Sequence, residues 1–261
     1  MKKDVICVAS WSGGKDSTFL IDEMLRGRGP LDEIVFCDTG YEFPMMYTYI
    51  EKMKKYWEDK YGAKITLLNW KQGKEIWHKF SEGPFSKGQH KGQKRGFPYS
   101  VGMSWCTREL KVKPMQNYIK EKYSNKEIVF YVGIAYNEPD RVKDTGETYP
   151  LVEWKITEDE IAKILAERGL HNPLYNHFHR TGCFTCPKQS LTSLYKLWKH
   201  YPEQWRVIRR MQSRYTKENA GVFLFRFHTW QQLQAKFIKY EAKGKPTHYL
   251  EEALPIGCMC K

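Results

Sequence analysis

A short glycine-containing run near the amino terminus constrains the fold of this 261-residue chain more than any other segment. The run SGGKDS, residues 12–17, stands between the apolar stretch 5–9 and the amphipathic stretch 18–25. This order predicts a strand, a tight turn and a helix, because glycine lacks a Cβ and lets the backbone take up positive φ and approach an anion closely. The N–H groups at the start of a helix, with the positive end of its dipole, complete a cradle for phosphate.

The polar side chains of this run support the same interpretation. Lys15 adds a mobile positive charge, Asp16 or Ser17 could cap the helix, and the hydroxyls of Ser12 and Ser17 could reach phosphate oxygens. Two glycines alone would be equally typical of an ordinary capped turn. The spacing is neither that of a Walker A loop nor that of a dinucleotide-binding G-x-G-x-x-G. A phosphate site and an ordinary capped turn are therefore both open at this point.

Strand-like and helix-like segments alternate in the amino-terminal part of the chain. Apolar runs rich in β-branched and aromatic residues predict strands at 5–9, 33–37, 64–68 and 127–132, and amphipathic periodicity predicts helices at 18–26, 44–61 and 109–123. This alternation predicts an α/β fold with a doubly wound parallel sheet and right-handed crossovers. Ligands of such sheets bind beyond the carboxyl ends of the strands.

The chain becomes helical after about residue 155. Thr157 and Glu160 form a capping-box pattern before the segment 161–168, and further helices are expected around 191–215 and 231–242. We therefore expect a nucleotide-binding α/β domain over residues 1–155. A helical, cysteine-containing region packed on it would cover residues 156–261.

The formal net charge of +13 predicts a polyanionic partner. Basic residues gather in the segments 71–95 and 196–214, interleaved with Trp77, Phe85, Phe97, Tyr195, Trp198 and Trp205. Cations for phosphates and rings for stacking are typical of a nucleic-acid surface. The alternative is a solvated basic surface beside a pocket for the nucleotide's own phosphates. Since no apolar run reaches about 20 residues and no signal peptide is evident, we expect a cytoplasmic protein without a membrane partner.

A second polar segment, residues 38–44, follows the second predicted strand. The Asp38 carboxylate could bind a ribose hydroxyl or position Mg²⁺. Gly40 permits a tight turn before Pro44 begins a helix. The segment 133–141 follows another strand and should face the same site, where Arg141 could pair with phosphate or sulfate.

The chain has seven cysteines, and an intracellular protein should keep them reduced. The C-x-x-C at Cys183 and Cys186 then indicates a metal site or a redox pair. Cys7 and Cys37 fall in predicted strands and are expected to be buried apolar residues.

These motifs resemble known enzymes. The SGGKDS run matches the S-G-G-x-D-S signature of the PP-loop, or ATP pyrophosphatase, superfamily, and residues 38–44 resemble the D-T-G-x-x-F-P run of the branch that contains the phosphoadenylyl-sulfate (PAPS) reductases. The resemblance continues through most of the chain. It implies an adenine nucleotide alpha hydrolase-like (HUP) fold, binding of an adenine nucleotide and a place in sulfur metabolism.

The segment from Cys106 to Pro114 is similar to the C-C-x-x-x-K-x-x-P segment of adenylyl-sulfate reductases. Matching Lys111 and Pro114 places Cys106 on the first cysteine of the pair and Thr107 on the second. The resemblance implies a 4Fe-4S cluster on Cys106, Cys183 and Cys186 with one iron left open to carry sulfide. Cys258 or Cys260 could instead supply the fourth ligand or act as a mobile thiol. Zinc is the alternative metal, with His177 or His179 as a further ligand.

Lys15 separates the hypotheses about the reaction. The resemblance implies that reductases of this branch have usually lost the loop lysine, whereas ATP-cleaving members keep it. We therefore expect cleavage of ATP to AMP and pyrophosphate, adenylation of an acceptor and sulfur transfer to a nucleic acid or a small molecule. The alternatives are a PAPS or adenylyl-sulfate reductase and a non-catalytic, zinc-containing nucleic-acid-binding protein. Ala135, which replaces an arginine of related reductases, weakens the match to their substrate site.

The expected site can be stated residue by residue. The expected catalytic residues are Lys15, Asp38, Lys111 and Arg141. The expected cofactor-binding residues are Ser10, Ser12, Gly13, Gly14, Lys15, Asp16, Ser17, Asp38, Thr39, Gly40 and Gly133. The expected cofactors are ATP, Mg²⁺ and a 4Fe-4S cluster, with Zn²⁺ as the alternative to the cluster. The expected partners are the nucleotide substrate, tRNA or DNA, a sulfur donor or thioredoxin-like reductant, and a second copy of the chain in a homodimer.

Overall fold

The structure is a computed structural model that describes residues 5–88, 90–98, 105–216 and 228–244. It contains two compact units that interleave along the chain. The first unit comprises residues 1–38, 42–71 and 111–182, and the second comprises residues 39–41, 72–110 and 183–261. The predicted division at residue 155 stays a prediction.

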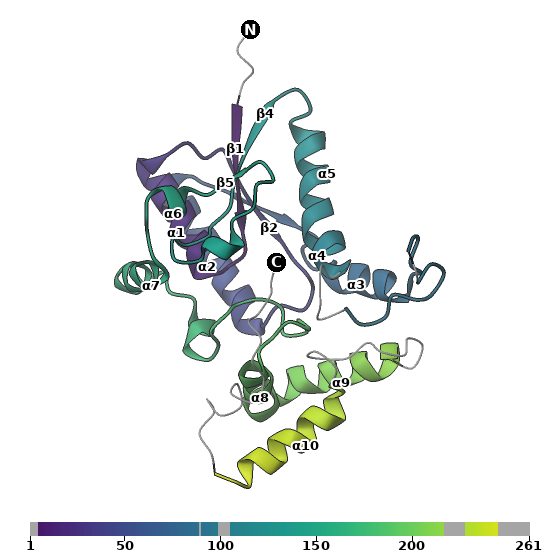
Figure 1. The fold of residues 1–261 in the computed structure, drawn as a ribbon. Helices are drawn as coiled ribbons and strands as arrows, with labels where there is room; N and C mark the ends of the chain where they lie inside the picture. Colours follow the sequence, from purple (N-terminus) through teal and green to yellow (C-terminus); the bar gives the residue numbers. More distant parts are fainter. Residues whose placement is uncertain (1–4, 89, 99–104, 217–227, 245–261) are drawn as a thin grey trace. The chain divides into compact units, whose positions relative to one another are not determined.

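A parallel sheet forms the centre of the first unit (Figure 1). Its strand order is β3-β2-β1-β4-β5, and the strands are β1 (Val5–Trp11), β2 (Glu33–Cys37), β3 (Ile65–Leu68), β4 (Glu127–Tyr131) and β5 (Glu147–Thr148). Every pair of neighbouring strands is parallel. The four predicted strands are confirmed, and so is the α/β fold class.

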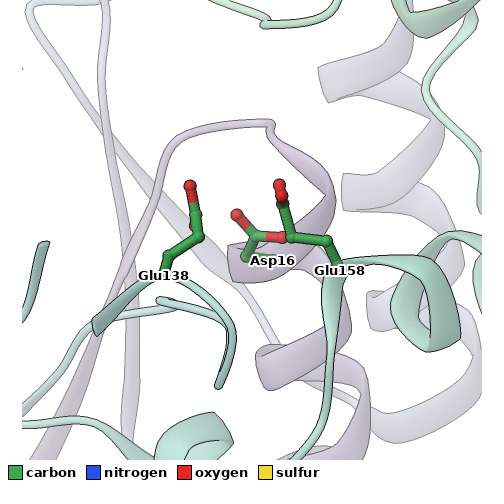
Figure 2. A group of neighbouring side chains, drawn as sticks. All are labelled: Asp16, Glu138 and Glu158. Carbon is green, nitrogen blue, oxygen red and sulfur yellow. The ribbon is translucent and has the colours of Figure 1, made fainter. Parts of the chain in front are cut away.

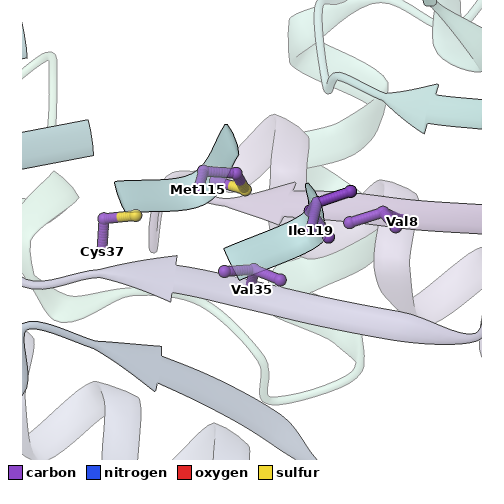
Figure 3. Close-up of a cluster of buried hydrophobic side chains, with 5 residues drawn as sticks. All are labelled: Val8, Val35, Cys37, Met115 and Ile119. Atoms are coloured by element: carbon purple, nitrogen blue, oxygen red, sulfur yellow. The ribbon is translucent and has the colours of Figure 1, made fainter. Parts of the chain in front are cut away.

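One face of the sheet packs against α5 (Lys113–Lys122). Successive side chains of a strand point to opposite faces, and Val8, Val35 and Cys37 form a buried cluster with Met115 and Ile119 of α5 (Figure 3). Burial raises the pKa of the Cys37 thiol to about 11. Cys37 is therefore a small apolar core residue, as predicted.

The opposite face packs against α2 (Pro44–Tyr61), whose bounds are those predicted. Trp11 of β1 lies at the centre of an aromatic cluster there. Its ring centroid lies 5.2 Å from that of Trp57, 5.6 Å from that of Phe36 and 6.1 Å from that of Tyr49. Aromatic contacts on one face and the α5 cluster on the other make the unit doubly wound.

The helix after β1 differs from the expectation at its start. α1 (Lys15–Glu23) has Gly14 as its N-cap and no side-chain cap. Capping by Asp16 or Ser17 was therefore a wrong prediction, because both residues already lie in the first turn of the helix. The segment η1 (Met24–Arg28) continues from α1.

The remaining helices of the first unit are short. η2 (Arg108–Val112) precedes α5, and its first three residues belong to the second unit. The stretch after β4 carries η3 (Pro139–Arg141), α6 (Pro150–Glu153), α7 (Glu158–Glu167) and η4 (Pro173–Asn176). The predicted capping box of α7 is confirmed, because Thr157 and Glu160 exchange the expected hydrogen bonds.

The regular secondary structure described in the second unit is helical, apart from isolated bridges such as the two within residues 84–94. It contains α3 (Gly73–Glu82), α4 (Trp105–Thr107), α8 (Leu191–His200), α9 (Pro202–Thr216) and α10 (Trp230–Glu241). Pro202 begins α9 and divides the segment that was predicted to be helical over 191–215. No helix in the described ranges has both the length and the apolar character that crossing a bilayer requires.

Most of the aromatics predicted to stack on bases lie in the core of the second unit. Trp77, Phe97, Tyr195 and Trp205 are 0–5% exposed. The stacking role is therefore wrong for these four. Phe85 and Trp198 are half-buried.

A carboxylate ties three elements together at the amino-terminal end of β2. Glu33 is 7% exposed and accepts hydrogen bonds from Thr66 of β3 and from three side chains of α5 and its end: Tyr118 at 3.0 Å, Lys122 at 2.5 Å and Tyr123 at 2.6 Å. Burial alone would raise the pKa of Glu33. The hydrogen bonds outweigh burial and hold this pKa below its ordinary value of 4.5.

We expect Glu33→Gln to lower the free energy of unfolding at pH 7 by about 2–3 kcal/mol, because it removes a charge that four donors surround. A group whose pKa is depressed in the folded state stabilises the fold above its unfolded pKa and loses this effect as the pH falls. The difference from wild type should therefore shrink below about pH 4.5. Urea unfolding at pH 7 and pH 3.5 measures it.

The matched control is Glu127→Gln, which removes an exposed carboxylate from the first residue of β4. It should leave the stability within about 0.5 kcal/mol of wild type. Equal stability of Glu33→Gln and wild type at pH 7 would contradict the prediction.

Candidate functional site

The strand order reverses between β1 and β4. From β1 the chain proceeds outward to β2 and β3 and then returns to β4 on the other side of β1. Ligands of open α/β sheets bind at the carboxyl ends of the strands at such a switch point. The glycine loop, residues 12–17, follows β1 here, and Gly133 follows β4.

Gly133 allows the two loops to approach closely. A Cβ on Gly133 would lie 2.6 Å from the backbone nitrogen of Ser17 and 2.7 Å from its Cα. Gly13 has φ +73°, as expected for the turn. The predicted cofactor role of Gly133 stays a prediction, and the structure shows a packing role that sequence reasoning missed.

The hydroxyls of the glycine loop bond within the loop. The backbone N–H of Ser12 donates to Ser17 Oγ at 3.2 Å, the two hydroxyl oxygens lie 3.0 Å apart, and Gly14 N–H donates to Ser12 Oγ at 3.3 Å. Ser10 lies in β1 opposite Val35 and is half-buried. The loop is thus shaped by its own side chains.

Three carboxylates gather at the start of α1. Oxygen atoms of Asp16, Glu138 and Glu158 all lie within 4.8 Å of one another (Figure 2). They come from α1, from the residue before η3 and from the first residue of α7. We name these residues the acidic group. Three hard oxygen donors suit Mg²⁺ or Ca²⁺.

Two cations that were expected to bind phosphate pair with the acidic group. Lys15 Nζ pairs with Glu158 and lies 3.9 Å from Asp16 Oδ1. Arg141 pairs with Glu138 and lies 3.8 Å from Asp16 Oδ2. The structure therefore brings together Lys15, Asp16 and Arg141 from the expected set. Sequence reasoning missed Glu138 and Glu158, for which the only signal was their nearness in sequence to Arg141 and to the capping box.

The surroundings of the acidic group shift the pKa values of Asp16 and Lys15. Burial raises the pKa of the Asp16 carboxyl to about 6, and repulsion from Glu138 and Glu158 acts in the same direction, against the attraction of Lys15 and Arg141. Burial would lower the pKa of Lys15, but its hydrogen bond to Glu158 and the charge of Asp16 raise this pKa above its ordinary value. Lys15 is therefore charged at neutral pH.

Asp38 is held by its own unit. It is 1% exposed, and it accepts a hydrogen bond from the Tyr47 hydroxyl at 2.9 Å and from the Lys71 backbone N–H at 3.2 Å. Lys111 is half-buried, and its carbonyl oxygen lies 3.5 Å from Cys37 Sγ. The catalytic roles of Asp38 and Lys111 stay predictions.

Thr39 and Gly40 belong to the second unit. Thr39 is 3% exposed, and Gly40 has φ +79°. A Cβ on Gly40 would lie 2.1 Å from the backbone nitrogen of Lys74, so this turn requires glycine. Binding of a cofactor by Thr39 or Gly40 stays a prediction.

The three cysteines of the expected metal site share the second unit and are half-buried without a disulfide. Cys183 and Cys186 form a turn in which the Cys186 N–H donates to the Cys183 carbonyl at 3.1 Å. Cys106 lies on α4. Cys258 and Cys260 lie outside the described residues, and His177 and His179 belong to the first unit.

A series of aromatic contacts links these two cysteine segments. Phe184, inside the C-x-x-C turn, lies edge-on to Tyr41 with ring centroids 5.8 Å apart. Tyr41 contacts Trp77 at 5.6 Å, and Trp77 contacts Trp105, the neighbour of Cys106, at 5.2 Å. The cysteine segments thus belong to one packed neighbourhood. Among the described residues, the group of three potential metal ligands whose atoms lie within 4.8 Å of one another is Asp16, Glu138 and Glu158, so a metal or cluster on the cysteines stays a prediction.

Comparisons with known proteins agree with the motifs. The family model described as phosphoadenosine phosphosulfate reductase domain matches residues 6–189. Two uncharacterized proteins of Methanocaldococcus jannaschii are 28% and 27% identical over 85% and 87% of this chain, which correspond to 44% and 52% of those proteins. A nin region protein of Escherichia phage lambda is 30% identical over 53% of this chain and 51% of its own. The chain thus spans about half the length of the curated relatives it matches.

A solved structure is also similar. The crystal structure of a PAPS reductase from Candida auris in a phosphate complex has a TM-score of 0.42 and 14% sequence identity to this chain. The match covers 68% of this chain and 80% of the other.

The raised pKa of Asp16 predicts how stability depends on pH. The carboxyl has a pKa of about 6 in the folded state against an ordinary value of 3.8, so its ionisation opposes folding. Stability from this group is complete below the unfolded pKa and is lost as the pH rises through about 6. We expect Asp16→Asn to be more stable than wild type by about 2 kcal/mol at pH 8, with the difference vanishing toward pH 4.

Urea unfolding at pH 8, 6 and 4 measures this difference. The control is Asp59→Asn, which removes a carboxylate that is 59% exposed and pairs with Lys55 on α2. It should change stability by less than about 1 kcal/mol at every pH. An Asp16→Asn variant that is less stable than wild type at pH 8 would refute the account of the acidic group.

Proposed function

This chain belongs to the phosphoadenosine phosphosulfate reductase domain family, and from that premise we propose that it cleaves ATP to adenylate an acceptor for sulfur transfer. The observation that carries the proposal is Lys15 in the glycine loop, at the amino end of α1 and beside the acidic group. A charged lysine and helix N–H groups stabilise a triphosphate and the charge that develops as pyrophosphate leaves.

The acidic group supports a metal-dependent reaction. Asp16, Glu138 and Glu158 would hold Mg²⁺, which supplies neutralisation of phosphate charge. With their carboxylate partners engaged, Lys15 and Arg141 would pair with phosphate oxygens instead. Lys15 and Arg141 would thus pair with carboxylates in the absence of ligand and with phosphate oxygens when Mg²⁺ and a nucleotide are bound.

The proposed reaction has two displacements. An oxygen of the acceptor attacks the α-phosphorus of ATP, the bond to the bridging oxygen breaks, and pyrophosphate leaves. A sulfur nucleophile then attacks the acceptor carbon, and AMP leaves with the oxygen. Lys15 and the glycine loop would orient the phosphates in the first step.

The cysteines support a role in the second step. Cys106, Cys183 and Cys186 would be thiolate ligands of a 4Fe-4S cluster, and a cluster with three protein ligands leaves one iron open to carry sulfide. Zinc on the same thiolates is the alternative. In the other alternative, Cys258 or Cys260 supplies the fourth ligand and no iron is left open.

The distribution of charge supports a nucleic-acid acceptor. The first unit has 22 Lys and Arg and 22 Asp and Glu, whereas the second has 21 and 8. The second unit therefore carries the whole net charge of +13. Exposed arginines of α9, among them Arg206 and Arg210, contribute to it. Such a field attracts a polyanion and makes its binding salt-dependent.

A pyrophosphate-release assay tests the first displacement. Protein purified without oxygen should release pyrophosphate from MgATP in the presence of the correct nucleic acid. Lys15→Met should lower the rate by about 100-fold or more, because it removes charge stabilisation of the transition state. Lys143→Met, which removes an exposed lysine of the same unit, should keep the wild-type rate.

Unchanged activity of Lys15→Met, or no binding of ATP, would refute ATP cleavage. The family match favours a second candidate, a PAPS or adenylyl-sulfate reductase. Thioredoxin-dependent release of sulfite from either nucleotide would establish it. Iron, sulfide and zinc analysis of the same preparation separates both enzymes from a non-catalytic zinc protein, which would be colourless and inactive toward nucleotides.

Nucleic-acid binding gives a separate prediction. Replacing Arg206 and Arg210 by glutamine should weaken binding of a mixed tRNA pool several-fold and lower the slope of log affinity against log salt by about 2. A matched double variant of exposed lysines in the first unit, Lys120→Gln with Lys126→Gln, should bind as wild type. Equal effects of the two double variants in a filter-binding titration would refute a nucleic-acid surface on the second unit.

A further inference from the structure

A segment after α7 lies against the glycine loop of the first unit. We name residues 172–181 the strap. Asn172, which is 2% exposed, donates from Nδ2 to the Gly13 carbonyl at 2.7 Å. Its Oδ1 accepts a hydrogen bond from the Leu174 N–H at 3.0 Å, so Asn172 caps the amino end of η4. The strap is therefore anchored at its beginning to the turn of the glycine loop.

Tyr175 of the strap contacts the start of α1. The Lys15 backbone N–H donates to the Tyr175 hydroxyl at 2.9 Å, and Lys15 Nζ lies 5.3 Å from the centroid of the tyrosine ring. The Thr181 side chain is hydrogen-bonded to Tyr175. A Cβ on Gly14 would lie 3.3 Å from the Tyr175 hydroxyl and 3.2 Å from Thr181 Oγ1. Two hydroxyls of the strap thus lie directly against the glycine loop.

The backbone N–H of Lys15, which donates to the Tyr175 hydroxyl, is also a donor that a bound anion would accept from. Lys15 is the first residue of α1, so its N–H has no acceptor within the helix. Such N–H groups, aligned with the helix dipole, bind phosphate. Burial raises the pKa of Tyr175, so its side chain is a neutral phenol at pH 7. A charged phosphate oxygen accepts a hydrogen bond about twice as strong as one to a neutral oxygen.

We propose that Tyr175 is a displaceable stopper of the glycine loop, whose hydroxyl holds the Lys15 N–H until a phosphate group takes its place. The proposal rests on the proposed function in one respect, namely that the loop binds phosphate. Displacement also releases the contact between Lys15 Nζ and the tyrosine ring, so Glu158 and Asp16 remain as the partners of the lysine. Tyr175 is thus a positioning residue that tunes affinity, and it takes no part in bond cleavage.

The test is calorimetric titration of inorganic pyrophosphate with Mg²⁺ into wild type and Tyr175→Phe. The phenylalanine variant keeps the ring but leaves the Lys15 N–H without its competitor. It should bind pyrophosphate about three- to tenfold more tightly, since wild type must first break one hydrogen bond. A hydroxyl with a merely structural role would move the affinity in the opposite direction, because its loss would loosen the loop.

A second variant and a control complete the experiment. Thr181→Val removes the partner of Tyr175 and should tighten binding by a smaller factor in the same direction. Tyr149→Phe removes a hydroxyl that bonds to the backbone of Lys143 in the same unit and should bind as wild type.

The outcomes separate this proposal from the proposed function. Equal or weaker binding by Tyr175→Phe, with wild type still binding, overturns the stopper and leaves ATP cleavage standing. No binding of pyrophosphate or ATP by either protein overturns both. Tighter binding by Tyr175→Phe supports the stopper even if the pyrophosphate-release assay gives no turnover.

Discussion

The first unit depends on one close approach of two backbones. β1 and β4 are neighbours, with Ala9 opposite Tyr131, so the loops that follow them leave the sheet side by side. The chain at Gly133 then passes the first turn of α1 at a distance that excludes a Cβ. This contact allows the loop after β4 to bring Glu138 and Arg141 to Asp16. Without it, Glu138 would not reach Asp16, and the acidic group would be reduced to Asp16 and Glu158.

Local sequence patterns predicted most of the sheet. The four main strands follow from short apolar runs, and α2 follows from Pro44 and an amphipathic repeat that ends at Gly62. The start of α1 was misplaced because a glycine-rich turn leaves several positions open to an N-cap. In the structure the N-cap is Gly14, whose backbone is extended.

Contacts between distant segments could not be predicted in this way. Lys15 meets Glu158, 143 residues away, and Tyr175, 160 residues away, and no periodicity links such pairs. The presence of basic neighbours in the sequence also did not show which aromatic residues are buried in the core and which are exposed. Trp77 and Trp205 stand among lysines and arginines in the sequence, yet they are buried because they lie on the inner faces of α3 and α9.

Opposite charges nearly cancel at the candidate site, whereas the chain as a whole has a net charge of +13. At the glycine loop, three carboxylates face two cations, and these ion pairs keep the buried charges partnered. The pairing also means that a phosphate and a divalent cation arriving together would exchange partners with no large change in local charge.

The cysteines differ in a way that bears on their chemistry. Cys7 and Cys37 are 4% and 6% exposed within the sheet, and the raised pKa of Cys37 leaves little thiolate to react. An alkylating reagent would not modify these two thiols in the folded chain and would modify them only after unfolding. Cys106, Cys183 and Cys186 are half-buried, so their protection from the same reagent would report a bound metal. Comparing the mass of the chain alkylated before and after chelation would thus count ligands directly.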